Sequence, residues 1–364
     1  MRDAAPRILF VPVSGPYGMG EYARCLAIAR AASQRWQGAS IHFVLSREAP
    51  YAADAPFAAT LLDSSPTFHC AAVVDLIETW RPDVVIFDNA GRTAQLRAAQ
   101  RLGARVVYIS ARRRQRRKAF RWRWLSLIDE HWIAYPEFIA GSLEWFERFK
   151  LKVAAGPMVR YLDVILSRAG SEQRAAILKR AGCSPAGFVL VVPGGGTGHP
   201  GVDDAADRFR TAARTLAAGG MATVYVGPAQ GGGEVEDVGA QSNWHPLGSL
   251  PQAELVELMC AARLIISNGG STLLQAIACG NACIAVPIAR DQADRIRRCV
   301  AAGVALAAPL DAAGIVQSAN RLLQDEPARA ALKGRAVRLG LADGVEVALQ
   351  ALAGLLPSQG AVGT

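Results

Sequence analysis

Two glycines followed by two hydroxyl residues, at positions 269–272, have the composition of a phosphate site. They lie between an apolar run, Leu264–Ile266, which predicts a buried strand, and a helical pattern that continues to Cys279. The first N–H groups of a helix have no intrahelical partner, and they lie at the positive end of the helix dipole. The segment therefore predicts a diphosphate site. We assign to it Asn268, Gly269, Gly270, Ser271 and Thr272.

Further side chains of the same segment have positions suited to the groups next to a diphosphate. Gln275 lies about one turn into the predicted helix, where a side chain could reach a ribose. A second apolar run, Cys283–Val286, is followed by a polar turn that contains Asp291 and Gln292. The predicted order is therefore strand, glycine turn, helix, strand and polar turn.

A second glycine-rich turn, at positions 15–20, follows the apolar run Ile8–Val13. Gly18 and Gly20 in this turn would allow an acceptor to approach the backbone closely. Glu21 comes next, and its carboxylate could act as a general base. The alternative is that Glu21 is an acidic residue favoured in a first helical turn by the helix dipole.

Other acid–base candidates also follow predicted strands. Asp88 comes directly after Val84–Phe87, so it could be the base or orient one, or it could cap the helix that begins near Arg92. Glu137 and His199 are weaker candidates, because each has an ordinary explanation as a helix-start or loop residue.

The loop after the apolar run Val189–Val192 contains four glycines within five positions, 194–198. Such a loop lets the backbone come close to a ligand. We expect Gly195 and Thr197 to contact phosphate and His199 to contact phosphate or sugar. It is not a Walker A loop, because no Gly-Lys-Ser/Thr follows.

Apolar runs of strand length alternate with helical patterns along all 364 residues, and the last run expected as a strand in the N-terminal half is the short Lys152–Ala155. This alternation predicts parallel sheets with helices on both faces, and two such series predict two doubly wound, Rossmann-like α/β domains. We expect the first of these domains at 1–160 and the second at 161–340. Residues 341–364 would form a final helix and a frayed tail.

The net charge of +9 is concentrated in one segment. Its basic residues are Arg112, Arg113, Arg114, Arg116, Arg117, Lys118, Arg121 and Arg123, and Trp122 and Trp124 lie among them. Arginine interleaved with tryptophan suits an anionic membrane surface, to which each Lys or Arg contributes about 1 kcal/mol. Nucleic acid is the less favoured partner, because no recognised nucleic-acid module surrounds the segment.

No run of the sequence reaches the roughly 18 apolar residues of a membrane span, and Ile8–Val13 is too short for a signal sequence. We expect a cytoplasmic protein, peripherally associated with the inner face of the cytoplasmic membrane. The seven cysteines form no metal-binding pattern and are interpreted as buried thiols.

The segments Asn268–Gln292 and Gly15–Ala29 resemble GT-B glycosyltransferases. They are most similar to the peptidoglycan lipid-intermediate N-acetylglucosaminyltransferase family and the related UDP-sugar hydrolase of pseudaminic acid synthesis. The resemblance implies an acceptor-binding domain at 1–160 and a nucleotide-sugar-binding domain at 161–340, with an interdomain cleft. It also implies a last helix that returns to the N-terminal domain. It also implies metal-independent transfer without a cofactor.

The resemblance also implies roles for single residues. The backbone near Leu247 would contact the nucleotide base, and Asp291 with Gln292 would contact the sugar. Gln275 occupies the position where the family commonly has a ribose-binding acid, and Glu21 occupies that of a catalytic histidine.

The function we expect is transfer of a sugar from a nucleotide-sugar, with UDP as the expected nucleotide, to a lipid-linked or otherwise anionic acceptor by an inverting mechanism. Two alternatives stay open. One is a nucleotide-sugar hydrolase, because Ala23-Arg24-Cys25-Leu26 is close to the hydrolase motif. The other is a non-catalytic membrane or nucleic-acid binding protein on the same scaffold.

Overall fold

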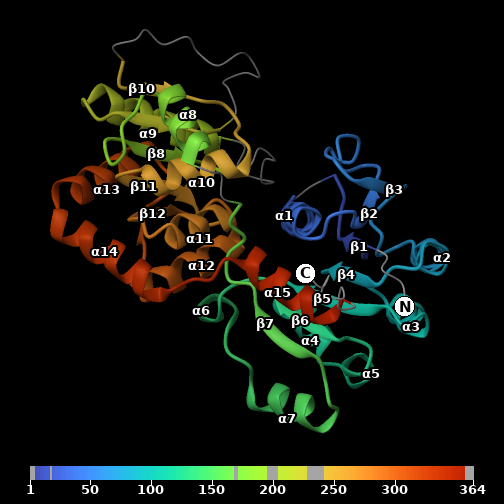
Figure 1. The fold of residues 1–364 in the computed structure, drawn as a ribbon. Coiled ribbons are helices and arrows are strands. Elements are labelled where there is room, and N and C mark those ends of the chain that lie inside the picture. The colour runs from blue at the N-terminus through green and yellow to red at the C-terminus, as the bar shows by residue number, and fades with distance from the viewer. Residues whose placement is uncertain (1–4, 17–18, 168–170, 195–203, 228–241, 357–364) are drawn as a thin grey trace, which may run out of the picture. The chain divides into compact units, whose positions relative to one another are not determined.

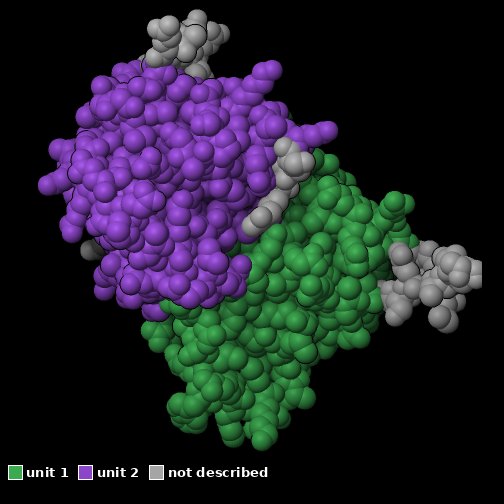
Figure 2. All heavy atoms as spheres, turned by 60° about the vertical axis from the view of Figure 1, so that its left-hand side comes forward, with its two compact units in different colours: residues 1–165, 342–364 green, residues 166–341 purple. Residues whose placement is uncertain are grey.

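The computed structural model describes residues 5–16, 19–167, 171–194, 204–227 and 242–356. The chain forms two compact units (Figures 1 and 2). Unit 1 comprises residues 1–165 and 342–364, and unit 2 comprises residues 166–341. The division therefore falls five residues after the expected end of the first domain at 160.

Unit 1 contains a parallel sheet of seven strands in the order β3-β2-β1-β4-β5-β6-β7. The strands are β1 (Arg7–Pro12), β2 (Ser40–Ser46), β3 (Ala58–Leu62), β4 (Val84–Asp88), β5 (Arg105–Ser110), β6 (Glu130–Ile133) and β7 (Met158–Tyr161). The helices are α1 (Gly20–Arg35), α2 (Cys70–Trp80), α3 (Thr93–Arg101), α4 (Arg113–Ala119), α5 (Trp122–Leu125), α6 (Glu137–Ala140), α7 (Trp145–Val153) and α15 (Gly344–Leu355).

The two faces of this sheet carry separate hydrophobic cores. Ile8 and Phe10 of β1 belong to one cluster, and Leu9 and Val11 belong to the other. This division follows from the period of two along a strand. Because both faces are covered, the central strands are apolar throughout, as parallel strands usually are.

The C-terminal helix α15 belongs to unit 1 (Figure 1). Its Ala348, Ala351 and Leu352 are buried in the same cluster as residues of α1. Asp343 caps the helix by accepting a hydrogen bond of 2.9 Å from Val345 N. Gly344 is required here, since a Cβ on it would lie 2.1 Å from the Leu162 carbonyl oxygen.

Unit 2 contains a parallel sheet of six strands in the order β10-β9-β8-β11-β12-β13. The strands are β8 (Val189–Val192), β9 (Thr223–Tyr225), β10 (Trp244–Pro246), β11 (Leu264–Asn268), β12 (Cys283–Val286) and β13 (Leu306–Ala307). The helices are α8 (Ser171–Arg180), α9 (Ala205–Ala218), α10 (Gln252–Ala261), α11 (Ser271–Ala278), α12 (Arg290–Ala301), α13 (Ala312–Gln324) and α14 (Glu326–Leu339). The prediction of two doubly wound α/β domains is confirmed.

Two local expectations differ from the structure. The run Lys152–Ala155, expected as a strand, is the end of α7 and the turn after it, and the strand is β7 instead. A capping box between Glu144 and Glu147 initiates α7 and favours the helix over this short apolar run. The half-buried strand β3 was not expected, because its sequence Ala-Ala-Thr-Leu-Leu lacks a clear alternation.

Among the described residues, we find no helix with both the length and the hydropathy to cross a bilayer.

Candidate functional site

Each sheet has one point where the strand order reverses. In unit 1 this point lies between β1 and β4, and in unit 2 it lies between β8 and β11. The chain leaves the two strands of such a pair in opposite directions, so a crevice opens beyond their carboxyl ends, where ligands of open parallel sheets bind. Asn268 to Thr272 lie at the end of β11 and just after it, Gly20 and Glu21 follow β1, and Asp88 is the last residue of β4.

The glycine turn after β11 is held by side chains at both of its peptide N–H groups. Gly270 N donates to Asn268 Oδ1 at 2.9 Å, and Gly269 N donates to Gln292 Oε1 at 3.1 Å. The expectation that these two glycines offer free donors is therefore corrected. Gly270 is the N-cap of α11 and has no side chain to cap the first turn, so the donors for a phosphate are those from Ser271 onward.

Gln292 at the start of α12 is buried and fixes the turn. Its Oε1 also accepts a hydrogen bond of 3.1 Å from Ile288 N, so one amide ties the ends of β11 and β12 together. Two backbone N–H groups thus occupy the Oε1 of Gln292, and the expected sugar contact of this residue stays a prediction. Asp291 is also in the first turn of α12, and its side chain is outside the described residues.

Two glycines allow the site loops to pack closely. A Cβ on Gly269 would lie 2.8 Å from Ile296 Cδ1 and 2.9 Å from Gln292 Cβ. Gly194 follows β8 and has φ of +110°. A Cβ on it would lie 2.1 Å from Asn268 Nδ2. Asn268 therefore joins the loops that follow the two strands of the switch point.

Of the other residues expected to contact a ligand, some lie in the described part of the chain and some lie outside it. Gln275 is buried in the second turn of α11. Leu247 follows β10 and is half-buried, and its N–H donates to the Tyr225 carbonyl oxygen at 2.9 Å. Gly195, Thr197 and His199 lie outside the described residues, as does Gly18 of the first unit.

Glu21 is held in unit 1 by Asn89, a residue that was not among the expected site residues. Glu21 is half-buried in the first turn of α1, directly after the exposed Gly20. Asn89 Nδ2 donates to Glu21 Oε1 at 2.8 Å, and Asn89 Oδ1 accepts from Ala111 N at 2.9 Å. The second bond fixes the amide orientation, so the carboxylate of Glu21 is positioned across the switch point.

Asp88 does not have the accessible position expected of a base. Its carboxylate is 0% exposed and accepts two hydrogen bonds from the Arg24 guanidinium, at 2.7 and 2.9 Å. Burial raises the pKa of Asp88 to about 6, although the charge of Arg24 opposes this shift. The structure therefore corrects this expectation: Asp88 ties α1 to the end of β4 and has no path to an acceptor hydroxyl. Glu137 is exposed at the start of α6.

The basic segment forms α4 and α5, and part of it is structural. Arg116 is buried in an ion pair of 2.6 Å with Glu147, and Trp124 is 1% exposed and donates to Thr93 Oγ1 at 3.0 Å. Lys118 donates to the Gly91 carbonyl at 2.6 Å, and burial beside several arginines lowers its pKa to about 8. The assignments of Arg116 and Trp124 to anion binding are corrected, because both are buried, and that of the half-buried Lys118 stays a prediction. The exposed members are Arg112, Arg113, Arg114, Arg117, Arg121, Trp122 and Arg123.

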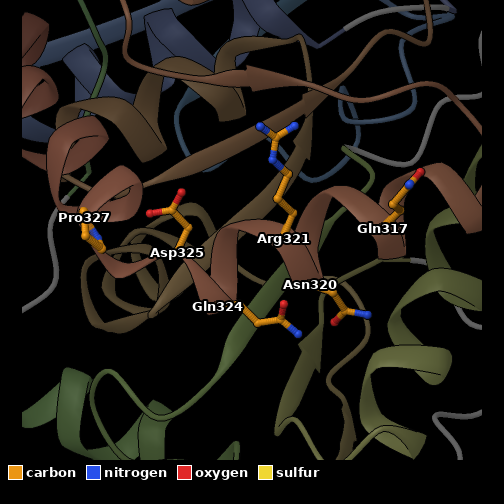
Figure 3. A pocket seen from close by; sticks show the side chains of 6 residues that line it. All are labelled: Gln317, Asn320, Arg321, Gln324, Asp325 and Pro327. Carbon is orange, nitrogen blue, oxygen red and sulfur yellow. The ribbon is translucent and has the colours of Figure 1, made fainter.

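Two surface hollows of unit 2 contain none of the expected donor contacts. The larger, of about 650 Å³, is lined by Gln317, Asn320, Arg321, Gln324, Asp325 and Pro327 (Figure 3). A smaller one, of about 350 Å³, lies between α8 and α10. The candidate donor site, at the switch point and the first turn of α11, lies outside both hollows.

Structures of known glycosyltransferases have the same fold as this chain. The spinosyn forosaminyltransferase SpnP matches with a TM-score of 0.65 at 15% identity, over 97% of this chain and 100% of that one. The spinosyn rhamnosyltransferase SpnG, complexed with thymidine diphosphate, gives 0.60 at 16% over 95% and 99%. LpCGTa, in complex with UDP, gives 0.59 at 15% over 98% and 100%.

No protein-family model matches the chain, and no curated protein matches it by sequence. At these identities the structural likeness establishes the fold, which is the two-domain GT-B fold with a parallel sheet in each domain.

Proposed function

We propose that this protein is an inverting GT-B glycosyltransferase that takes a sugar from a nucleotide-sugar. The observation that carries the proposal is the first turn of α11, which begins at a glycine N-cap beyond the switch point of the second sheet. Its N–H groups, its dipole and the hydroxyls of Ser271 and Thr272 suit a diphosphate. The glycosyltransferases of the same fold that hold thymidine diphosphate or UDP support this assignment.

The leaving diphosphate would gain its stabilisation from α11. As the sugar departs, negative charge grows on the phosphate oxygens, and prealigned N–H donors stabilise it without reorganisation. We therefore propose transfer that needs neither a metal ion nor a cofactor. UDP is the proposed nucleotide, on the resemblance of Asn268–Gln292 to enzymes that use UDP-sugars.

Glu21 is the proposed base. Its carboxylate would take the proton from an acceptor hydroxyl as that oxygen bonds to the anomeric carbon and the bond from this carbon to the diphosphate breaks. The hydrogen bond from Asn89 would keep the carboxylate in place before the acceptor arrives. Asn89 is thus a positioning residue.

The proposed acceptor is lipid-linked or otherwise anionic and lies at the cytoplasmic face of a membrane. The support for this is the charge of the exposed arginines of α4 and α5, which suits anionic headgroups or phosphates.

The test is nucleotide release from UDP-, TDP- and GDP-sugars, with and without a membrane-lipid extract as acceptor. The proposal expects slow release alone and faster release with extract, with the sugar recovered in the lipid fraction. Rapid release without extract would instead establish the hydrolase, to which Arg24-Cys25-Leu26 has a resemblance. No release and no binding would favour the non-catalytic alternative.

A further inference from the structure

Helix α7 of unit 1 exposes its aromatic side chains and buries an acid. Trp145 is 77% exposed, Phe149 is 51% exposed, and Phe146 and Val153 are exposed as well. The buried residue of this helix is Glu147. The four apolar residues fall at i, i+1, i+4 and i+8, so they share one side of the helix. A helix that packs against a protein core has the opposite pattern.

Arg116 of α4 explains why Glu147 points inward. The guanidinium pairs with the Glu147 carboxylate at 2.6 and 3.1 Å and also donates to the carbonyl oxygens of Ala140, Gly141 and Ser142 just before α7. A buried ion pair with these additional bonds fixes the rotation of α7 about its axis. The same contact that orients α7 therefore turns its aromatic residues to the solvent.

The aromatic residues of α7 and those of α5 belong to one surface. Lys150 Nζ lies 4.3 Å from the centre of the Phe146 ring and 5.5 Å from that of Trp122, and it donates to the Phe120 carbonyl at 3.1 Å. Trp122 is itself 51% exposed. In Figure 1, α4, α5 and α7 lie together at one end of unit 1.

Positive charge surrounds these rings. Arg113, Arg114 and Arg117 of α4 and Arg121 and Arg123 beside Trp122 are exposed, and Arg148 and Lys152 of α7 are exposed too. Glu144, an exposed acid, lies 3.5 Å from Arg113. We name the set Trp122, Trp145, Phe146, Phe149 and Val153, with these basic residues, the α5–α7 face.

We propose that the α5–α7 face inserts its aromatic rings into the headgroup region of an anionic lipid bilayer, while the surrounding Arg and Lys side chains bind the lipid phosphates. Tryptophan favours that depth, because its ring is apolar and its N–H can bond to water or lipid. Charge complementarity selects the bilayer over a second copy of this chain, since two such basic surfaces would repel each other. The inference extends the proposed membrane location, but lipid binding does not depend on glycosyl transfer.

The experiment is co-sedimentation of the full chain with phosphatidylglycerol vesicles and with phosphatidylcholine vesicles. The variant Trp145→Ser with Phe149→Ser should lower the partition coefficient on phosphatidylglycerol by at least about tenfold, because two large apolar side chains leave the interface. The matched control is Phe68→Ser, which removes another exposed aromatic ring of unit 1 and should bind like the wild type. Equal binding of the double variant and the control would overturn the proposal.

Two further measurements separate insertion from adsorption to the bilayer surface and from dimer formation. Brominated phosphatidylglycerol should quench wild-type tryptophan fluorescence, and Trp145→Phe should lose part of this quenching. Wild-type binding without any quenching would contradict insertion. If the wild type is a dimer in solution and Trp145→Ser with Phe149→Ser is a monomer, the face belongs to a second copy and the proposal is wrong.

A further pair of variants tests the contribution of positive charge to vesicle binding. Arg113→Gln with Arg117→Gln should weaken phosphatidylglycerol binding, and Arg335→Gln with Arg338→Gln on α14 should not, although the net charge is the same. Nucleotide-sugar affinity should be unchanged in all of these variants. A variant that loses vesicle binding but keeps its donor affinity would thus test lipid binding alone, whatever the outcome for the proposed transferase.

Discussion

Asn89 Nδ2 donates a hydrogen bond of 2.8 Å to Glu21 Oε1, although 68 positions separate the two residues in the sequence. The bond connects the residue after β4 to the first turn of α1 across the switch point of the first sheet. Asn89 has φ of +53°, a left-handed conformation that asparagine tolerates better than most residues. A backbone in this conformation beside a carboxylate is consistent with a site whose geometry is set before a ligand binds.

Glu21→Gln should lower turnover by about 10²–10⁴-fold and leave the donor Kd unchanged, because the amide cannot accept the acceptor proton. Steady-state kinetics with calorimetry of the donor checks this. Glu137→Gln is the matched control, since this acid is exposed at the start of α6. If Glu21→Gln turned over normally and Glu137→Gln turned over slowly, Glu137 would be assigned as the base instead.

Asn89→Gly should lower kcat more than it changes KM, because it removes the donor to Glu21. Glycine keeps the left-handed backbone without strain, so the variant isolates the side chain. If Asn89→Gly lowered kcat by the same factor in the Glu21→Gln variant as in the wild type, Asn89 would act independently of Glu21.

Asp88→Asn should destabilise unit 1 by about 3–5 kcal/mol, since it leaves the buried Arg24 charge without its partner. Replacing both residues, Asp88→Leu with Arg24→Met, should recover part of the loss. Urea unfolding followed by tryptophan fluorescence is suited to this test, because six of the seven tryptophans are in unit 1. A wild-type urea midpoint for Asp88→Asn would contradict the structural role of the pair.

His131 in β6 should make unit 1 sensitive to acid. It is fully buried beside Ser110, and burial, with a smaller contribution from Arg116, lowers its pKa to about 3. In the unfolded chain the His131 ring binds a proton below about pH 6.5, whereas in the folded chain it stays neutral down to about pH 3. The free energy of unfolding is therefore highest above about pH 6.5 and falls towards pH 3, by up to about 1.4 kcal/mol per pH unit. His131→Gln should flatten this slope between pH 6 and 4.5. The partly exposed His69→Gln should keep it, and equal slopes in the two variants would exclude His131 as the sensor.

Gly269→Ala should weaken donor binding at least about tenfold, or about 1.4 kcal/mol, since a methyl group would push α12 away from the phosphate turn. The side chains it would meet, Ile296 and Gln292, are both buried. Gly354→Ala on α15 is the control, because a Cβ there meets no atom within 4 Å. Wild-type affinity in Gly269→Ala would indicate that the turn does not hold the ligand.

The sequence predicted the alternation of strands and helices well, because central parallel strands are apolar on both faces and glycines mark their ends. The edge strands β3 and β7 were missed, since half-buried edge strands have little pattern, and the run Lys152–Ala155 before β7 was wrongly expected as a strand. The glycine turn after β11 was found from residue types alone. That Gln292 and Asn268 occupy its N–H groups depends on contacts between distant segments, which local patterns do not contain.

The same limit explains the residues that were assigned differently. Arg116, Lys118 and Trp124 are indistinguishable by type from their exposed neighbours. They differ from them by their contacts with Glu147, Gly91 and Thr93, respectively. Asn89 gave one usable signal, its position directly after a central strand. The exposed rings of α7 gave none, because aromatic residues at helical spacing ordinarily indicate a buried face.

The central claim is that the first turn of α11 binds the diphosphate of a nucleotide-sugar, and calorimetry of UDP binding to Ser271→Ala with Thr272→Ala tests it most directly. Thr211→Ala with Thr215→Ala, two exposed threonines on α9, is the control. We expect the α11 variant to bind UDP at least about tenfold more weakly, or about 1.4 kcal/mol, and the control to bind like the wild type. Unchanged affinity in the α11 variant would contradict the claim.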